Sequence, residues 1–252
     1  MAFDDDGQQN PFTRPGFIGA AVVVAVIVTL GIIIAIVNAT REDPNPQPSS
    51  SAAAPVTSAV PTAEPSAVAG DASVCGLDGE ELTGSLATAP DAQWAYQGTT
   101  AYPTSTTYGP GETNDAGVRY CFQRSPSGAV MAAANAVTQG TDPATVGEWL
   151  AYFVANTPAG DALLASDSEN DAETAGTRVQ IAGFRLLSYT GTTARVDVAV
   201  RGTSEGQTVN MSMVYQLVWE AGDWKLHVDD PALPIDVAMI PDFVGYITWG
   251  SE

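Results

Sequence analysis

In the second half of the chain, apolar and polar residues alternate with a period of two. The alternation runs through residues 177–189, 193–201, 209–219 and 224–229. Such a pattern is typical of half-buried β-strands, and the short, turn-rich connections favour antiparallel pairing of neighbouring strands. The sequence therefore predicts a four-stranded antiparallel meander with one apolar face that needs cover.

Upstream of these strands, the apolar pattern has helical spacing. Residues 127–137 are mostly small and apolar and repeat at i, i+3, i+4 and i+7. A second helix is expected to begin at Thr141 or Asp142 and to break near Pro158, with a short third helix around residues 163–164. Helices followed by a meander indicate an α+β fold, with the helices packed on one face of a curved four-stranded sheet.

The N-terminal part contains a long apolar stretch, because residues 16–37 carry no charge. At about 1.5 Å per residue, a helix of this length crosses a hydrocarbon core of roughly 30 Å. The sequence predicts a transmembrane helix at residues 16–38 after a cytoplasmic tail, residues 1–15. A cleaved signal peptide ending near Ala39 is the alternative, although the apolar stretch is long and the tail is acidic rather than basic.

Composition divides the rest of the chain into three parts. Residues 39–70 are rich in proline, alanine and serine and have few large apolar side chains, which predicts an extended linker. Residues 71–126 are rich in glycine, proline and threonine, which indicates a loop-rich arm. Residues 127–252 then form the predicted α+β domain.

Cys75 and Cys121 are the only cysteines of the chain, and no metal-binding partner lies near them in the sequence. Two cysteines behind an apolar span and a linker predict one disulfide that ties the arm, in an oxidising compartment. The expected location is the cell membrane, with a single span, the N-terminus in the cytoplasm and the C-terminal domain outside it.

Charge narrows the classes of partner. The chain has 29 acidic and 9 basic residues, a formal net charge of −20. Such a surface repels phosphate backbones and anionic lipid headgroups, so direct binding of nucleic acid by the folded domain is not expected.

Candidate catalytic residues are few. Ser125 and Ser127 precede the first helix, but they lack the glycine-flanked pattern of a nucleophile elbow and are expected to cap the helix. His227 alternates with apolar residues and is expected at the surface or an interface. Asp197 and Asp229 lie on the polar phase of their strands, so the sequence indicates no buried acid. No catalytic residue and no cofactor is assigned.

An acidic run at residues 166–173 raises the question of a calcium site, because oxygen-rich loops suit that cation. The sixth position of the loop is Ala172 rather than glycine, and the twelfth is Arg178 rather than glutamate. A solvated acidic loop is therefore expected and no metal ligand is assigned, while cation binding stays open.

Three stretches carry a resemblance to known proteins. They are CFQRSPSGAVMAAANAV at residues 121–137, VYQLVWEAGDWKLH at residues 214–227 and FVGYITWG at residues 243–250. With the order of elements, they resemble the cone-shaped nuclear transport factor 2-like (NTF2-like) fold. Within it, the predicted order of a short cytoplasmic tail, one span, a linker and an outer cone resembles the assembly scaffold subunits of type IV secretion and conjugation machines. The three stretches themselves look like single-pass proteins of actinobacterial mobile elements. The resemblance covers roughly residues 75–250 and brings no catalytic motif.

The resemblance implies a non-enzymatic, membrane-anchored scaffold of a conjugative transfer apparatus. Its expected partners are other membrane or cell-envelope proteins, with self-association open. Tyr246 and Trp249 are candidate docking residues, although large aromatic side chains more often seal a fold. The alternative function is an extracytoplasmic module that binds a lipid or another small ligand in a cavity of the cone, and an enzyme ranks last.

Overall fold

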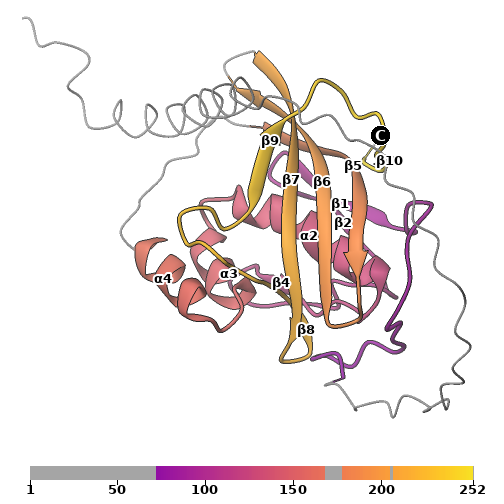
Figure 1. Cartoon of the computed structure of the whole chain (residues 1–252), viewed down its shortest axis with the longest axis vertical. Helices are drawn as coiled ribbons and strands as arrows, with labels where there is room; N and C mark the ends of the chain where they lie inside the picture. Colours follow the sequence, from indigo (N-terminus) through magenta and orange to yellow (C-terminus); the bar gives the residue numbers. More distant parts are fainter. Residues whose placement is uncertain (1–71, 168–177, 205–206, 252) are drawn as a thin grey trace, which may run out of the picture. The chain divides into compact units, whose positions relative to one another are not determined.

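A six-stranded antiparallel sheet is the largest element of the structure, a computed structural model that describes residues 72–167, 178–204 and 207–251 (Figure 1). Its strands are β5 (Arg178–Tyr189), β6 (Thr193–Ser204), β7 (Gln207–Glu220), β8 (Asp223–Leu226), β9 (Asp236–Met239) and β10 (Ile247–Thr248). β5 to β8 are neighbours in sequence and in the sheet. β10 pairs with β5 at one margin, and β8 and β9 both pair with β7 at the other.

The alternation of side chains decides which face of the sheet is buried. In β6, Val196, Val198 and Val200 point to the same face, because successive side chains of a strand point to opposite faces. All three are fully buried in the main hydrophobic core. The period of two seen in the sequence therefore marks the face that packs against the rest of the protein.

The helix α2 (Pro126–Gly140) covers this buried face. On α2, every residue from Pro126 to Gln139 is buried, because the helix also contacts a hairpin formed by β1 (Gln93–Gln97) and β2 (Thr100–Thr104). A helix that is apolar or small on all sides is typical of such enclosure.

The remaining elements are short. They are β3 (Glu112–Thr113), β4 (Arg119–Tyr120), α3 (Val146–Phe153) and α4 (Pro158–Asp167). α3 contacts α2 and β8 and buries the stacked rings of Trp149 and Phe153, whose centroids are 4.9 Å apart. Residues 71–126, predicted as a loop-rich arm, thus contain two hairpins, β1–β2 and β3–β4.

Residues 240–246, here called the crossing segment, run from β9 to β10 over the sheet face opposite α2. The amide of Asn210 in β7 donates to the carbonyl oxygen of Pro241 at 3.2 Å. The guanidinium of Arg201 in β6 lies over the ring of Phe243, 5.4 Å from its centroid. The segment therefore contacts successive strands on its way across the sheet.

The predicted fold class was wrong. The sequence predicted a curved four-stranded sheet with two helices on one face, but the sheet has six strands and α2 lies between the sheet and the β1–β2 hairpin. β9 and β10 were missed because strands of 4 and 2 residues are too short to show a period of two. The NTF2-like cone is corrected accordingly, and the conjugation and type IV secretion functions that rested on it lose their support.

The predicted membrane localisation is also corrected. No helix in the described part of the chain is long and apolar enough to span a membrane. The longest helix there, α2, has 15 residues, whereas a span needs about 20. The segment predicted as a transmembrane helix, residues 16–38, lies outside the described residues, as do residues 1–15 and 39–70. The described residues therefore give no support to the predicted single-pass topology or to the location that rested on it.

Candidate functional site

The structure contains the predicted disulfide between Cys75 and Cys121. Cys121 follows β4 in a left-handed backbone conformation, with φ of 66°. The carboxylate of Asp223, at the start of β8, accepts hydrogen bonds from two successive backbone N–H groups, at 2.7 Å from Cys121 and 2.9 Å from Phe122. The disulfide and Asp223 therefore hold the same turn of the chain from two sides.

Tyr152 of α3 and Lys225 of β8 complete a buried polar cluster around Asp223. The hydroxyl of Tyr152 donates to Asp223 Oδ2 at 2.8 Å. Lys225 Nζ donates to the carbonyl oxygen of Tyr152 at 2.7 Å and lies 3.1 Å from the centroid of its ring. The cluster thus joins the disulfide turn, α3 and the sheet.

Burial perturbs the ionisation of all three side chains. Burial lowers the pKa of Lys225 to about 8, against the raising effect of Asp223 and Glu220. Burial raises the pKa of Asp223, although its hydrogen bonds with the backbone oppose the rise. The pKa of Tyr152 is raised by burial and then by Asp223.

Such a carboxylate, phenol and amine can transfer protons in an enzyme if a substrate reaches them. Asp223 is fully buried, Lys225 is 6% exposed, and both oxygens of Asp223 already accept hydrogen bonds from the chain. These contacts favour a structural role for the cluster.

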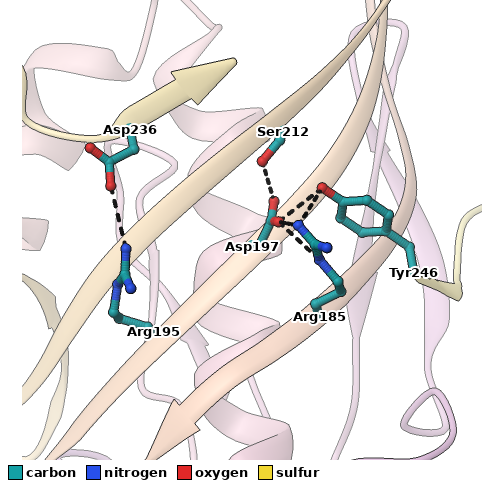
Figure 2. Close-up of polar contacts among 6 residues, drawn as sticks. All are labelled: Arg185, Arg195, Asp197, Ser212, Asp236 and Tyr246. Atoms are coloured by element: carbon teal, nitrogen blue, oxygen red, sulfur yellow. Dashed lines mark hydrogen bonds and ion pairs between the residues drawn. The ribbon is translucent and has the colours of Figure 1, made fainter. Parts of the chain in front are cut away.

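A second buried carboxylate, Asp197, lies at the centre of the sheet face opposite α2 (Figure 2). Ser212 donates to Asp197 Oδ1 at 2.7 Å, and the hydroxyl of Tyr246 donates to Oδ2 at 2.8 Å. Arg185 forms an ion pair with the same Oδ2 and holds its guanidinium 4.2 Å from the centroid of the Tyr246 ring. The hydrogen bond to Asp197 raises the pKa of Arg185.

The Asp197 cluster ties the crossing segment to the sheet. Arg185, Asp197 and Ser212 come from β5, β6 and β7, while Tyr246 comes from the crossing segment (Figure 2). Both oxygens of Asp197 have partners within the chain, so this carboxylate is not placed to act as a general base.

The expectation that the chain has no buried acid was wrong. Asp197 lies on the polar phase of β6 as predicted, but Tyr246, 49 residues away in sequence, helps to cover it. Asp223 follows the glycine of a tight turn, a position that usually faces solvent. The local sequence gives no signal for either burial, because both result from contacts with distant segments.

The two predicted docking residues have internal contacts. Trp249 is 6% exposed, and its ring centroid lies 5.3 Å from that of Trp94 in β1 and 5.4 Å from that of Phe184 in β5. Tyr246 donates to Asp197, as described above. Trp249 thus closes the margin between the hairpin and the sheet, and Tyr246 anchors the crossing segment.

The candidate serine and histidine do not meet in a catalytic pair. Ser125 Oγ accepts the N–H of Gly128 at 3.0 Å and caps α2. His227 Nε2 lies 3.3 Å from a carboxylate oxygen of Asp229. His227 also lines a surface cavity of 360 Å³ on the face opposite α2, together with Arg195. Each residue therefore has a separate local role.

No group of three or more His, Cys, Asp or Glu side chains that could hold a metal ion occurs among the residues that the structure describes. Most of the acidic run at residues 166–173 falls outside them, since the description stops at residue 167 and resumes at residue 178.

Side chains fill the space between the sheet and α2. The largest fully buried side chains there include Met131 of α2, Phe184 of β5 and Trp224 of β8. A cavity of 580 Å³ lies instead at the surface, beside the β1–β2 hairpin. Its lining includes four consecutive small polar side chains, Thr104, Ser105, Thr106 and Thr107. In the described part of the chain, side chains thus occupy the place that a lipid or another small ligand would need inside the core.

Exposed apolar side chains gather on and around β9. The described residues contain nine large exposed hydrophobic side chains, of which five lie on β9, in the segments that flank it or on its neighbour β7. These five are Val209, Leu233, Val237, Met239 and Val244. Val209, Val237 and Met239 lie on the same face of the sheet, and we call these three the β9 surface. Val237 and Met239 pair with Met213 and Met211 of β7, so they continue the apolar face of the sheet beyond the cover of the core.

Comparisons with known proteins identify a family but no function. No curated protein and no solved structure matches the chain. The family model described as Domain of unknown function (DUF8175) matches residues 45–248, which is more than half of the 252 residues. The chain therefore belongs to the DUF8175 family.

Proposed function

We propose that this chain is a non-enzymatic binding protein whose folded domain recognises another protein through the β9 surface. The observation that carries the proposal is that three of the nine large exposed hydrophobic side chains of the described residues, Val209, Val237 and Met239, lie on one face of β9 and its neighbour β7. Exposed apolar side chains that gather in one place mark interaction sites more often than single exposed ones do. Met239 is the most exposed large apolar residue of β9, at 62%.

The alternatives have weaker support in the described part of the chain. Enzymatic chemistry would need a reactive group that a substrate can reach, but the two buried carboxylates, Asp197 and Asp223, already have partners within the fold. A small ligand held inside the fold would need an internal cavity, but side chains fill the space between the sheet and α2.

Site-specific photo-crosslinking tests the proposal. The photoreactive residue p-benzoylphenylalanine replaces Met239 in the full-length chain, expressed in the cells that normally produce it. A matched variant carries the same residue at Leu187, which is also apolar and exposed. Leu187 lies on β5, toward the opposite margin of the sheet from β9. We expect discrete protein adducts from position 239 that are absent from position 187. Equal adducts from both positions, or none from position 239, would refute the proposal.

A further inference from the structure

Within the described ranges, one edge of the β9 backbone pairs with no strand. In the described residues β9 pairs with one strand only, β7, and Figure 1 shows it at the margin of the sheet. The N–H of Ile240 donates to the carbonyl oxygen of Asn210 in β7 at 3.0 Å. Because hydrogen-bonding direction alternates along an antiparallel strand, Asp236, Ala238 and Ile240 point their backbone groups toward β7. The N–H and C=O groups of Val237 and Met239 therefore point outward.

The same two residues present exposed side chains. Val237 is 37% exposed and Met239 is 62% exposed. Both lie on the side of the sheet that carries the buried valines of β6, because they pair across β7 in the same register. A strand added at this edge would therefore gain backbone hydrogen bonds from Val237 and Met239 and apolar contacts with their side chains.

Charge around the edge selects the partner. Residues 229–244 contain Asp229, Asp230, Asp236 and Asp242 and no Lys, Arg or His. Asp236 pairs with Arg195 of β6 at 3.5 Å (Figure 2), and Asp229 lies beside His227, so Asp230 and Asp242 are the acids of this stretch for which no ion pair is found among the described residues. A second copy of the chain would bring the same four carboxylates to the contact, and like charges disfavour that pairing. A phosphate backbone is disfavoured for the same reason. The charge of the edge therefore complements a basic segment.

The length of the edge limits the size of the contact. β9 has 4 residues, and Pro234 and Pro241 flank it. Since proline lacks an N–H, it cannot extend the row of backbone donors, and a short edge bounded by prolines resists open-ended aggregation. The occupant is therefore short.

Resting on the proposed function, we infer that the β9 edge binds a short extended segment of a partner protein as an added strand, and that Lys or Arg residues flank the apolar residues of this segment. The segment would place its apolar side chains against Val237 and Met239 and its cations near Asp230 and Asp242. Because the ion pairs would form at an exposed site, its affinity would fall as salt is added.

Selection from a random seven-residue peptide library, displayed on phage and applied to the immobilised full-length chain, tests this inference. The Val237→Pro variant removes an outward N–H and leaves the β7-facing bonds of Asp236 and Ala238 in place. The Val237→Thr variant keeps that backbone N–H and has a side chain of similar shape. Circular dichroism and a thermal melt confirm that both variants are folded.

We expect the selected peptides to be enriched in Lys or Arg and in alternating Val, Ile or Thr. Synthetic versions should bind Val237→Pro at least tenfold more weakly than the parent chain and Val237→Thr within about threefold of it, because only proline removes the edge donor. Replacing Lys and Arg of the peptide by Glu should also weaken binding at least tenfold. Methylating alternate backbone nitrogens of the peptide should have a similar effect.

Three results would overturn the inference: no enrichment of basic peptides, equal binding to Val237→Pro and the parent chain, or equal binding of the Glu-containing peptides. If adducts still form at position 239 in the crosslinking experiment, the proposed function survives and only the mode of binding is wrong. If those adducts are also absent, both fail.

Discussion

Replacing Asp223 by alanine should destabilise the fold severely. The substitution leaves the N–H groups of Cys121 and Phe122 and the hydroxyl of Tyr152 without their acceptor. Each buried donor left unpaired costs about 1–3 kcal/mol. Because removing the buried charge offsets part of this loss, we expect the free energy of unfolding to fall by about 3–5 kcal/mol, a large part of the roughly 5–15 kcal/mol typical of a domain.

Urea unfolding of the full-length, disulfide-bonded chain, followed by the fluorescence of its five tryptophans, measures the change. Asp223→Asn should lie between the parent and the alanine variant, because its amide oxygen still accepts one of the backbone bonds. Asp229→Ala is the matched control, since Asp229 is an exposed residue on the same stretch of chain, and it should stay within about 0.5 kcal/mol of the parent. A loss below about 1 kcal/mol for Asp223→Ala would show that the cluster does not hold the turn.

Three further changes probe the rest of the fold. A Cβ on Gly128 of α2 would lie 1.9 Å from the carbonyl oxygen of Gln123, so Gly128→Ala should destabilise by about 3 kcal/mol. Gly147→Ala is the matched control, because Gly147 also lies in the first turn of a helix but its added Cβ would meet nothing within 4 Å. This variant should stabilise the fold by roughly 0.5 kcal/mol. Equal effects of the two variants in urea unfolding would refute the explanation by steric clash. Reducing the disulfide, whose cysteines are 46 residues apart, should cost about 4 kcal/mol, measured with and without dithiothreitol. Burial lowers the pKa of Lys225 from 10.5 to about 8. Between these pH values the unfolded chain therefore binds more protons than the folded chain, so the free energy of unfolding should rise with pH from 8 until the tyrosines of the unfolded chain titrate near pH 10. A Lys225→Met variant that keeps this pH dependence would contradict the assignment to Lys225.

Local patterns in the sequence predicted the elements whose contacts are local. The meander from β5 to β8 has long alternating strands joined by short turns, so its register depends on neighbouring residues. The start of α2 has a serine cap, at Ser125, within three residues of the N–H that it accepts. The disulfide followed from there being only two cysteines.

Features that depend on distant contacts were not predictable in this way. The hairpin β1–β2 encloses α2 on the side away from the sheet. The alanines of α2 are equally consistent with a surface helix that buries only one face, so the sequence did not predict this enclosure. β9 joins β7 beside β8 only because the intervening loop returns to the same edge. The burial of Asp197 requires Tyr246 from the crossing segment. In each case the competing interpretation was consistent with the local pattern, and a tertiary contact decided against it.

The placement of cations explains why the surface is more acidic than the composition alone suggests. Six basic side chains of the described residues, other than histidine, have internal contacts: Arg119, Arg124, Arg185, Arg195, Arg201 and Lys225. Three of them are buried, and the remaining three pair with Asp197, Asp236 or the ring of Phe243. The acids, in contrast, lie mostly at the surface, so two copies of the domain repel each other. This repulsion protects the open β9 edge from self-pairing, and it leaves that edge available to a partner that carries the opposite charge.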